Sequence, residues 1–199
     1  MKLVVNVLLC AVFFLASVWR VEALTVVNSK HDFSALGGSP CGYCHSVHNG
    51  LGGTGMLNPG FGAFPSITNA YSSATRVYKS TLASLNSSDA PLCLACHDQS
   101  TIAANANLSE AKTRLDSRPD FPNGYINTDL SNDHPVGFVF DAAQSPTKIK
   151  TPLLANVTFG PGRNQMWCSS CHNVHDNTYG NFLVASNDVS ALCLDCHIK

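Results

Sequence analysis

The sequence predicts a fold of coil and short α-helices with little or no β-sheet, and two observations support this. Strong hydrophobic periodicity, which marks long helices and strands, is scarce along the 199 residues. Nine cysteines and eight histidines accompany only 13% charged residues, so the unusual part of the composition is side chains that bind metals. The formal net charge of −1 offers no basic surface to nucleic acid, and we expect no nucleic-acid partner.

The N-terminal segment 1–23 has the pattern of a signal peptide. Lys2 precedes an apolar run over 3–18, and a small-residue pattern ends at Ala23, after which we expect cleavage and export. The run is slightly shorter than the ~20 residues that span a bilayer, so no stable membrane anchor is expected. An uncleaved anchor helix is the alternative. Cys10 lies inside the run and is interpreted as an apolar residue that is lost with the leader.

The other eight cysteines all belong to C-x-x-C-H motifs, which we number 1 to 4 in chain order. The motifs are Cys41, Cys44 and His45; Cys93, Cys96 and His97; Cys168, Cys171 and His172; and Cys193, Cys196 and His197. This pattern is typical of c-type haem attachment, in which two thiols form thioethers with the porphyrin vinyl groups and the adjoining imidazole ligates iron. Zinc sites and redox dithiols also use C-x-x-C pairs. Four copies that consume every mature cysteine in an exported chain favour four covalently bound haem c groups.

Four histidines remain outside the motifs, and their number equals the number of haems. They are His31, His48, His134 and His175. Four irons with two axial positions each need eight ligands, so the count predicts that every iron has two histidine ligands and no open position. Met56 and Met166 are the competing axial ligands, because a thioether can occupy the sixth position and raise the reduction potential. We interpret both methionines as packing residues.

Two of these four histidines each follow a motif histidine by three positions. His48 follows His45, and His175 follows His172, so each lies on the same side of its helical turn as the proximal ligand. The distal site of that haem lies across the porphyrin plane, and His48 and His175 must therefore serve other haems. We expect His48 to ligate the haem of motif 2 and His175 the haem of motif 4. His31 and His134 then remain for the haems of motifs 1 and 3. The sequence does not decide which of the two histidines serves which haem.

An internal repeat organises the mature chain, 24–199, which is expected to form one tetrahaem domain. Residues 41–97 and 168–197 share the plan C-x-x-C-H-x-V-H, an insert, and L-C-L-x-C-H. Each is interpreted as a two-haem repeat. The linker 98–167 joins them and carries His134.

Secondary structure is expected at only a few places. These are a helix over 72–85, a weak helical window over 110–118, a turn-rich segment over 119–132, and a helix over 187–196 capped by Asn187 or Ser186. Pro135 keeps His134 out of a regular helix. The short apolar run that follows Pro135 is either a strand or a segment that packs against a porphyrin.

The motifs resemble those of a known family, the multihaem c-type cytochromes with doubled C-x-x-C-H motifs. The resemblance rests on C-G-Y-C-H-S-V-H with A-P-L-C-L-A-C-H, on C-S-S-C-H-N-V-H with A-L-C-L-D-C-H, and on D-L-S-N-D-H-P-V-G-F in the linker, and it spans residues 31–199. It implies a multihaem cytochrome c fold, mostly coil with short α-helices wrapped around four haems. Within the family, the chain looks most like the tetrahaem subunits of OmcE-like extracellular cytochrome filaments, or nanowires.

That resemblance implies a head-to-tail homopolymer in which one distal histidine of each subunit ligates a haem of its neighbour. His31 fits this role, because it lies on an N-terminal arm ahead of the first motif. A head-to-tail contact of this kind forms rings or open filaments. The alternative is that His31 folds back onto its own subunit and leaves a monomer. We expect an extracellular or cell-surface protein, with the periplasm as the alternative.

The ligand count also predicts the class of function. Iron with both axial positions filled changes oxidation state with little rearrangement and offers a substrate no binding position, so we expect electron transfer rather than catalysis. Its partners would be its own copies, other redox proteins or extracellular acceptors. The alternatives are a soluble periplasmic electron shuttle, a reductase of small nitrogen or sulfur compounds with one open haem, and a quinol-oxidising cytochrome anchored by an uncleaved leader. The low charge content favours permanent packing over the electrostatically steered encounters of a shuttle.

Overall fold

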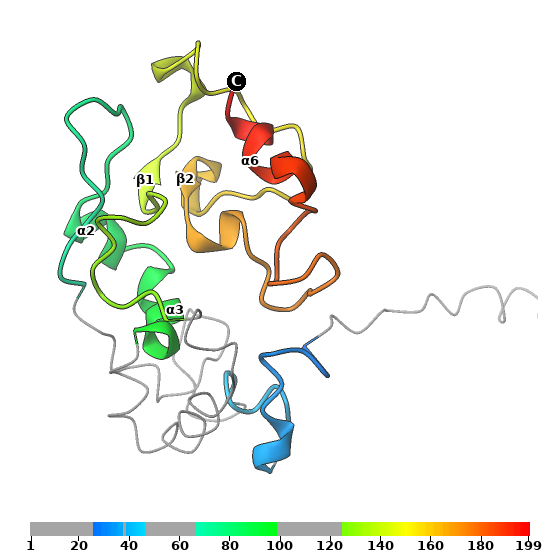
Figure 1. Ribbon diagram of the computed structural model, residues 1–199. Helices are drawn as coiled ribbons and strands as arrows, with labels where there is room; N and C mark the ends of the chain where they lie inside the picture. Colours follow the sequence, from blue (N-terminus) through cyan, green and yellow to red (C-terminus); the bar gives the residue numbers. More distant parts are fainter. Residues whose placement is uncertain (1–25, 38, 47–66, 99–124) are drawn as a thin grey trace, which may run out of the picture.

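The computed structural model describes residues 26–37, 39–46, 67–98 and 125–199. In this part of the chain, coil and turns connect a few short elements (Figure 1). The helices are α2 (Leu82–Asn86), α3 (Ala90–His97) and α6 (Ala191–Cys196), with short 3₁₀ helices η1 (Ser34–Leu36), η4 (Ala142–Gln144), η5 (Pro161–Arg163), η6 (Cys168–Ser170) and η7 (Asp188–Ser190). The strands are β1 (Phe138–Val139) and β2 (Gln165–Met166). The predicted fold of coil and short helices with little sheet is confirmed.

Several predictions fall outside the described residues. They concern the leader 1–23, His48, Met56 and the helical window 110–118. Among the residues that the structure does describe, no helix is long and apolar enough to cross a membrane.

Helix α2 is shorter than the sequence predicts, because residues 72–80 are not helical. The helix begins after Thr81, whose hydroxyl accepts a hydrogen bond from the Ser84 backbone N–H at 3.0 Å, while the Thr81 N–H donates to the Ser84 hydroxyl at 2.9 Å. This reciprocal capping box fixes the start of the helix at Leu82. The prediction over 72–85 is therefore correct only for its last turn.

Helix α3 carries motif 2 and packs on the main hydrophobic cluster. Pro91 lies in its first turn, where a missing backbone N–H costs nothing. The cluster consists of Ile67, Leu85, Ala90, Leu94 and Leu130. These residues come from the first insert, α2, α3 and the linker. Segments that are far apart in the sequence therefore pack against α3 and fix its position.

The apolar run after Pro135 forms a strand. β1 pairs with β2 in antiparallel register, with Phe138 opposite Met166. Both side chains are buried, at 9% and 5% exposure, which agrees with the interpretation of Met166 as a packing residue. His134 lies outside any helix, as the following proline predicts. The sheet joins two parts of the linker, the segment that follows His134 and the segment that leads into motif 3.

The C-terminal segment contains two short helices instead of the one predicted over 187–196. Val189 and Ser190 have positive φ angles of 47° and 66°, which break the helix between η7 and α6. The expected caps do not start α6. The Ser186 hydroxyl instead accepts from the Asp188 N–H at 3.1 Å and so supports η7. The backbone of the linker pairs with the end of α6, since the Lys150 N–H donates to Cys196 and the Ile198 N–H donates to Lys148, both at 2.8 Å.

Candidate metal centres

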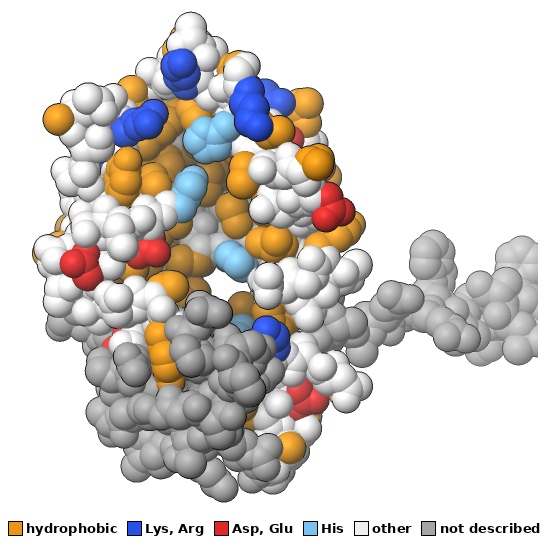
Figure 2. All heavy atoms as spheres, in the orientation of Figure 1, with side chains coloured by type: hydrophobic (Ala, Val, Ile, Leu, Met, Phe, Trp, Pro, Cys, Tyr) orange, Lys and Arg blue, Asp and Glu red, His pale blue; other side chains and the backbone are white. Residues whose placement is uncertain are grey.

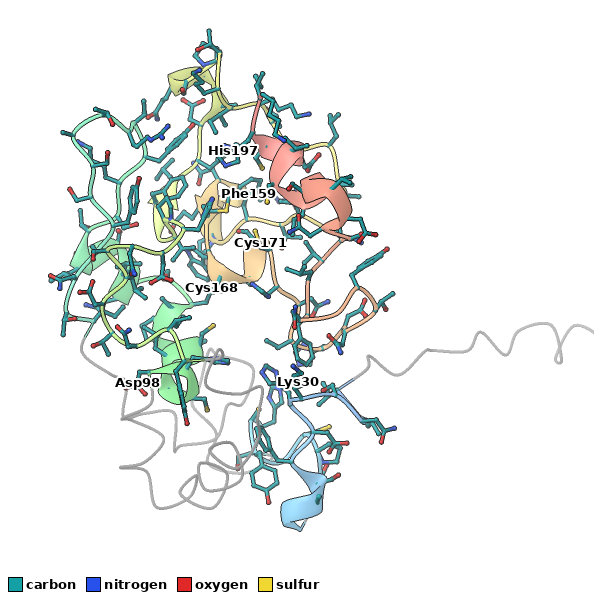
Figure 3. The ribbon with its side chains drawn as sticks, viewed as in Figure 1. Lys30, Asp98, Phe159, Cys168, Cys171 and His197 are labelled. Atoms are coloured by element: carbon teal, nitrogen blue, oxygen red, sulfur yellow. The ribbon has the colours of Figure 1, made fainter. Side chains whose placement is uncertain are left out.

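All four motifs form the same local turn. The N–H of the motif histidine donates to the carbonyl of the first cysteine, at 2.8 Å in motif 1, 3.1 Å in motif 3 and 2.9 Å in motif 4. In motif 2 the corresponding residues form the last turn of α3. One turn of helix therefore brings two thiols and an imidazole together in each motif. Figure 3 shows motif 3, with Cys168 and Cys171, between α3 and α6, while His197 of motif 4 lies further along the molecule.

The thiols of successive motifs are neighbours in space. The Cys93 thiol lies close to the Cys168 thiol, and this interaction together with burial raises the pKa of Cys168. Burial raises the pKa of Cys96 to about 12, with a smaller contribution from nearby Cys44. Burial likewise raises the pKa of Cys171, with a smaller contribution from nearby Cys193. Motif 1 thus adjoins motif 2, motif 2 adjoins motif 3, and motif 3 adjoins motif 4.

Burial is also the main cause of the raised pKa values of the Cys44 and Cys196 thiols. Burial raises the pKa of Cys44, and it raises the pKa of Cys196 to about 11, since a thiolate loses solvation in the interior. At neutral pH these side chains are therefore neutral thiols.

Three histidine pairs stand out in the described part of the chain. The ring centres of His45 and His175 are 6.0 Å apart with 20° between the ring planes. Those of His31 and His97 are 6.1 Å apart at 62°, and those of His134 and His197 are 6.2 Å apart at 86°. Each pair joins one motif histidine to one histidine from outside the motifs. Figure 2 shows histidines in a line down the middle of one face, with hydrophobic side chains around them.

Two histidines have a ring nitrogen fixed by the backbone. The Nδ1–H of His172 donates to the Asn181 carbonyl at 3.0 Å, and the Nδ1–H of His134 donates to the Pro135 carbonyl at 3.0 Å. A carbonyl only accepts, so the proton is on Nδ1 and the Nε2 lone pair is left for a metal. Although His134 as a residue is exposed, desolvation of its ring lowers the pKa of His134, which favours the neutral form that binds metals.

The neighbours of the non-motif histidines differ from the sequence-based expectation. The His175 ring lies beside that of His45 of motif 1, whereas the sequence predicts that His175 ligates the haem of motif 4. The physical reason is the linker, whose residues 148–150 pair with the end of α6 while His134 of the same linker faces His197. His134 therefore lies at motif 4 and not at motif 1 or 3. The expected partner of His48 cannot be compared, because His48 lies outside the described residues.

His31 lies at motif 2 of its own chain. Its ring is 6.1 Å from that of His97 and stacks on Phe182 at 4.3 Å between ring centres. The N-terminal arm therefore contacts motif 2 and Phe182 of the same chain. Phe182 is buried at 7% exposure. The sequence contains no indication that Phe182 stacks on His31, because an isolated phenylalanine in a turn-rich segment has no partner that a sequence pattern defines.

Asp195 is a second residue that the sequence did not single out. It lies between the two cysteines of motif 4 and is 7% exposed. Its carboxylate accepts hydrogen bonds from the backbone N–H groups of Leu153 at 3.0 Å and Leu154 at 3.2 Å. Ala95, at the same position of motif 2, is buried without a polar role. Asp195 thereby fixes the linker against motif 4.

The donor set fits haem better than a metal held by protein alone. In the described residues no group of three or more His, Cys, Asp or Glu side chains is placed to hold one ion. A structural zinc site needs four such ligands. A porphyrin supplies four nitrogens itself and needs only two further ligands from the protein, a number that one histidine pair could supply.

Comparison with known proteins agrees with this assignment. Residues 160–199, which contain motifs 3 and 4, match the model of the family described as Doubled CXXCH motif. No curated protein matches the chain. The match supports a multihaem c-type cytochrome, and its motifs imply covalently bound haem c in an electron-transfer protein. The fold of coil and short helices described above is consistent with that class.

Proposed function

We propose that the protein is an exported tetrahaem cytochrome that conducts electrons through four haems, each ligated by two histidines. The observation that carries the proposal is the pairing of motif histidines with non-motif histidines at 6.0 to 6.2 Å. By the histidine count, His48 supplies the eighth ligand. Haem iron supplies one-electron chemistry when bound, and the protein supplies attachment, ligation and burial.

The chain's own residues would do three things. The motif thiols fix each porphyrin covalently, and the turn that joins them to the histidine sets the proximal ligand on the same side. The contacts between motifs, such as Cys93 with Cys168, place successive attachment sites beside one another, so that electrons need cross only short gaps. Carbonyl partners such as Asn181 hold the ligating rings in one orientation.

We further propose a head-to-tail filament as the assembled form. The first cysteine of motif 1, Cys41, and the first cysteine of motif 4, Cys193, are both exposed. The segment 39–46 and α6 lie toward opposite ends of the described chain (Figure 1). An attachment site near the surface at each end would allow electrons to pass from one subunit to the next. The low charge content supports permanent contacts.

A soluble periplasmic shuttle is the second candidate, and one observation favours it. The backbone contacts of Lys148 and Lys150 with the end of α6 place two cationic residues beside motif 4. Figure 2 shows Lys and Arg side chains gathered toward that end of the visible face. A positive patch near a haem would steer a negatively charged redox partner. Electron microscopy of material sheared from the cell surface distinguishes the two candidates, because only the filament proposal expects fibres that contain this chain.

The electron-transfer proposal is tested on the native holoprotein. The mass should equal the chain without residues 1–23 plus four haems, and the reduced protein should not bind carbon monoxide, since no iron has an open position. Stoichiometric carbon monoxide binding at one haem in four would contradict ligation by two histidines throughout and would favour the reductase alternative. A mass without covalent haem would overturn the whole proposal.

A further inference from the structure

The three histidine pairs have the spacing of two imidazoles on opposite sides of one metal. An imidazole nitrogen binds a first-row transition metal at about 2 Å and lies about 1 Å from its own ring centre, so two trans imidazoles have centres about 6 Å apart. The observed separations of 6.0, 6.1 and 6.2 Å agree with this value and with one another.

Ordinary aromatic contact explains these pairs less well. Aromatic rings that attract one another have centres anywhere from about 4.5 to 7 Å apart, and nothing in such contact selects the partners. The contact between Tyr78 and Phe138, at 4.8 Å and 30°, is of that kind. The three histidine pairs instead differ by only 0.2 Å, and each contains one motif histidine and one non-motif histidine. Iron ligation accounts for both regularities.

Resting on the proposed function, we infer that three axial ligand pairs are completed within one chain, and that one of them joins the two sequence repeats. His45 and His175 would ligate the haem of motif 1, His97 and His31 the haem of motif 2, and His197 and His134 the haem of motif 4. The pair at motif 1 takes one ligand from each two-haem repeat and therefore joins the repeats through iron. His31 is used within its own subunit, so subunits of a filament would associate without exchanging this ligand.

The angles between the rings make the pairs distinguishable by electron paramagnetic resonance (EPR). Nearly parallel imidazole planes split the iron d orbitals and give a rhombic low-spin spectrum, whereas nearly perpendicular planes leave two orbitals close in energy and give a strongly anisotropic signal at large g. The holoprotein should therefore show a rhombic haem from His45 and His175, at 20°, and a large-g haem from His134 and His197, at 86°.

Substitution then tests which histidine belongs to which signal. His175→Ala should convert about one haem in four to high spin with loss of the rhombic signal, and His134→Ala should remove the large-g signal. Tyr179→Phe, in the same loop as His175 and 49% exposed, is the control and should leave every signal unchanged. Loss of the large-g signal in His175→Ala would overturn the inference, because it would place His175 at motif 4.

A second variant keeps the test valid if His175→Ala does not fold. His175→Met retains a sixth ligand, so the protein should stay low-spin while one of its four reduction potentials rises. The rhombic signal should again be the one that changes. If a different low-spin signal changes, the pairing is wrong, although the cytochrome function proposed above would stand.

The ligation of His31 is tested on monomeric holoprotein. The wild-type monomer should be fully low-spin, and His31→Ala should create about one high-spin haem in four. Val27 lies on the same arm and is 53% exposed, so Val27→Ala is the control and should stay fully low-spin. A high-spin haem in the wild-type monomer that disappears on assembly would overturn the inference and assign His31 to the neighbouring subunit. Absence of covalent haem from all variants would instead refute the proposed function.

Discussion

The carboxylate of Asp89 accepts hydrogen bonds from the backbone N–H groups of Cys168 at 2.9 Å and Ser169 at 2.8 Å. Asp89 immediately precedes α3, which carries motif 2, and Cys168 is the first residue of motif 3. The two residues are 79 positions apart. The bond therefore fixes the start of one haem-attachment helix to the start of the next motif, and only 9% of Asp89 is exposed to solvent.

Asp89→Ala should destabilise the holoprotein by about 1–3 kcal/mol, because two backbone N–H groups lose their acceptor in a buried place. Asp89→Asn should fall between this variant and wild type, since one amide oxygen can serve only one of the two donors well. Urea unfolding followed by haem absorbance measures the effect. Asp188→Ala, at an exposed position, is the control. Equal stability of Asp89→Ala and wild type would contradict a structural role for this bond.

Gly137→Ala should also destabilise the protein, by about 1–3 kcal/mol, because φ is +75° there and an alanine in this region is strained. The added Cβ would lie 3.0 Å from the Ser84 carbonyl oxygen and 3.1 Å from the Leu85 backbone nitrogen. Gly180→Ala is a matched control, since its φ is +74° and nothing lies within 4 Å of the added atom. The loss of stability in Gly137→Ala beyond that in Gly180→Ala measures the cost of the steric contact with α2. Equal losses in the two variants would show that the backbone of α2 moves aside at no cost.

Tyr78 gives a pH dependence with a defined sign. Its hydroxyl donates to the Asp141 carbonyl, and burial, reinforced by the Asp141 charge, raises the pKa of Tyr78 above its ordinary 10.0. The native state therefore binds this proton more tightly than the unfolded state. Its contribution to stability is complete below pH 10.0 and decreases as the pH rises further.

Tyr78→Phe should cost about 1 kcal/mol at neutral pH through the lost hydrogen bond. The difference in free energy of unfolding between wild type and variant should shrink as the pH rises above 10.0. Tyr179→Phe, which removes an exposed hydroxyl, controls for general effects of alkaline pH. Parallel pH profiles for wild type and Tyr78→Phe would show that the native pKa of Tyr78 is not raised.

The motifs were predictable from sequence because their chemistry is local. Two thiols and an imidazole within five residues form one turn, whatever the rest of the chain does, and the turns at Cys41 and Cys193 have the same backbone hydrogen bond. The scarcity of periodicity likewise predicted a fold of short elements. The start of α2 was missed because the capping box of Thr81 with Ser84 outweighs the weak helical pattern before it.

The histidine partners were not predictable because they depend on long-range packing. The three-residue step from His172 to His175 predicts that the two histidines serve different haems, but it does not predict which motif lies beside His175. That is decided by contacts such as Asp89 with Cys168 and Asp195 with Leu153, which join segments 79 and 42 residues apart. The sequence around Asp89 or Asp195 has no pattern that distinguishes a buried carboxylate bonded to a distant backbone from an exposed charge.

Removal of the haems should abolish cooperative folding. The main hydrophobic cluster of the described chain has only five members, of which Leu85 and Leu94 are the fully buried large ones. Such a core is small against the conformational entropy that the described segments lose on folding. A chain with all eight motif cysteines replaced by serine should therefore show little helix by circular dichroism, no sharp thermal transition and rapid proteolysis. The holoprotein, measured in parallel, should unfold cooperatively and resist protease. A sharp transition in the haem-free chain would show that the polypeptide holds this fold without its cofactors.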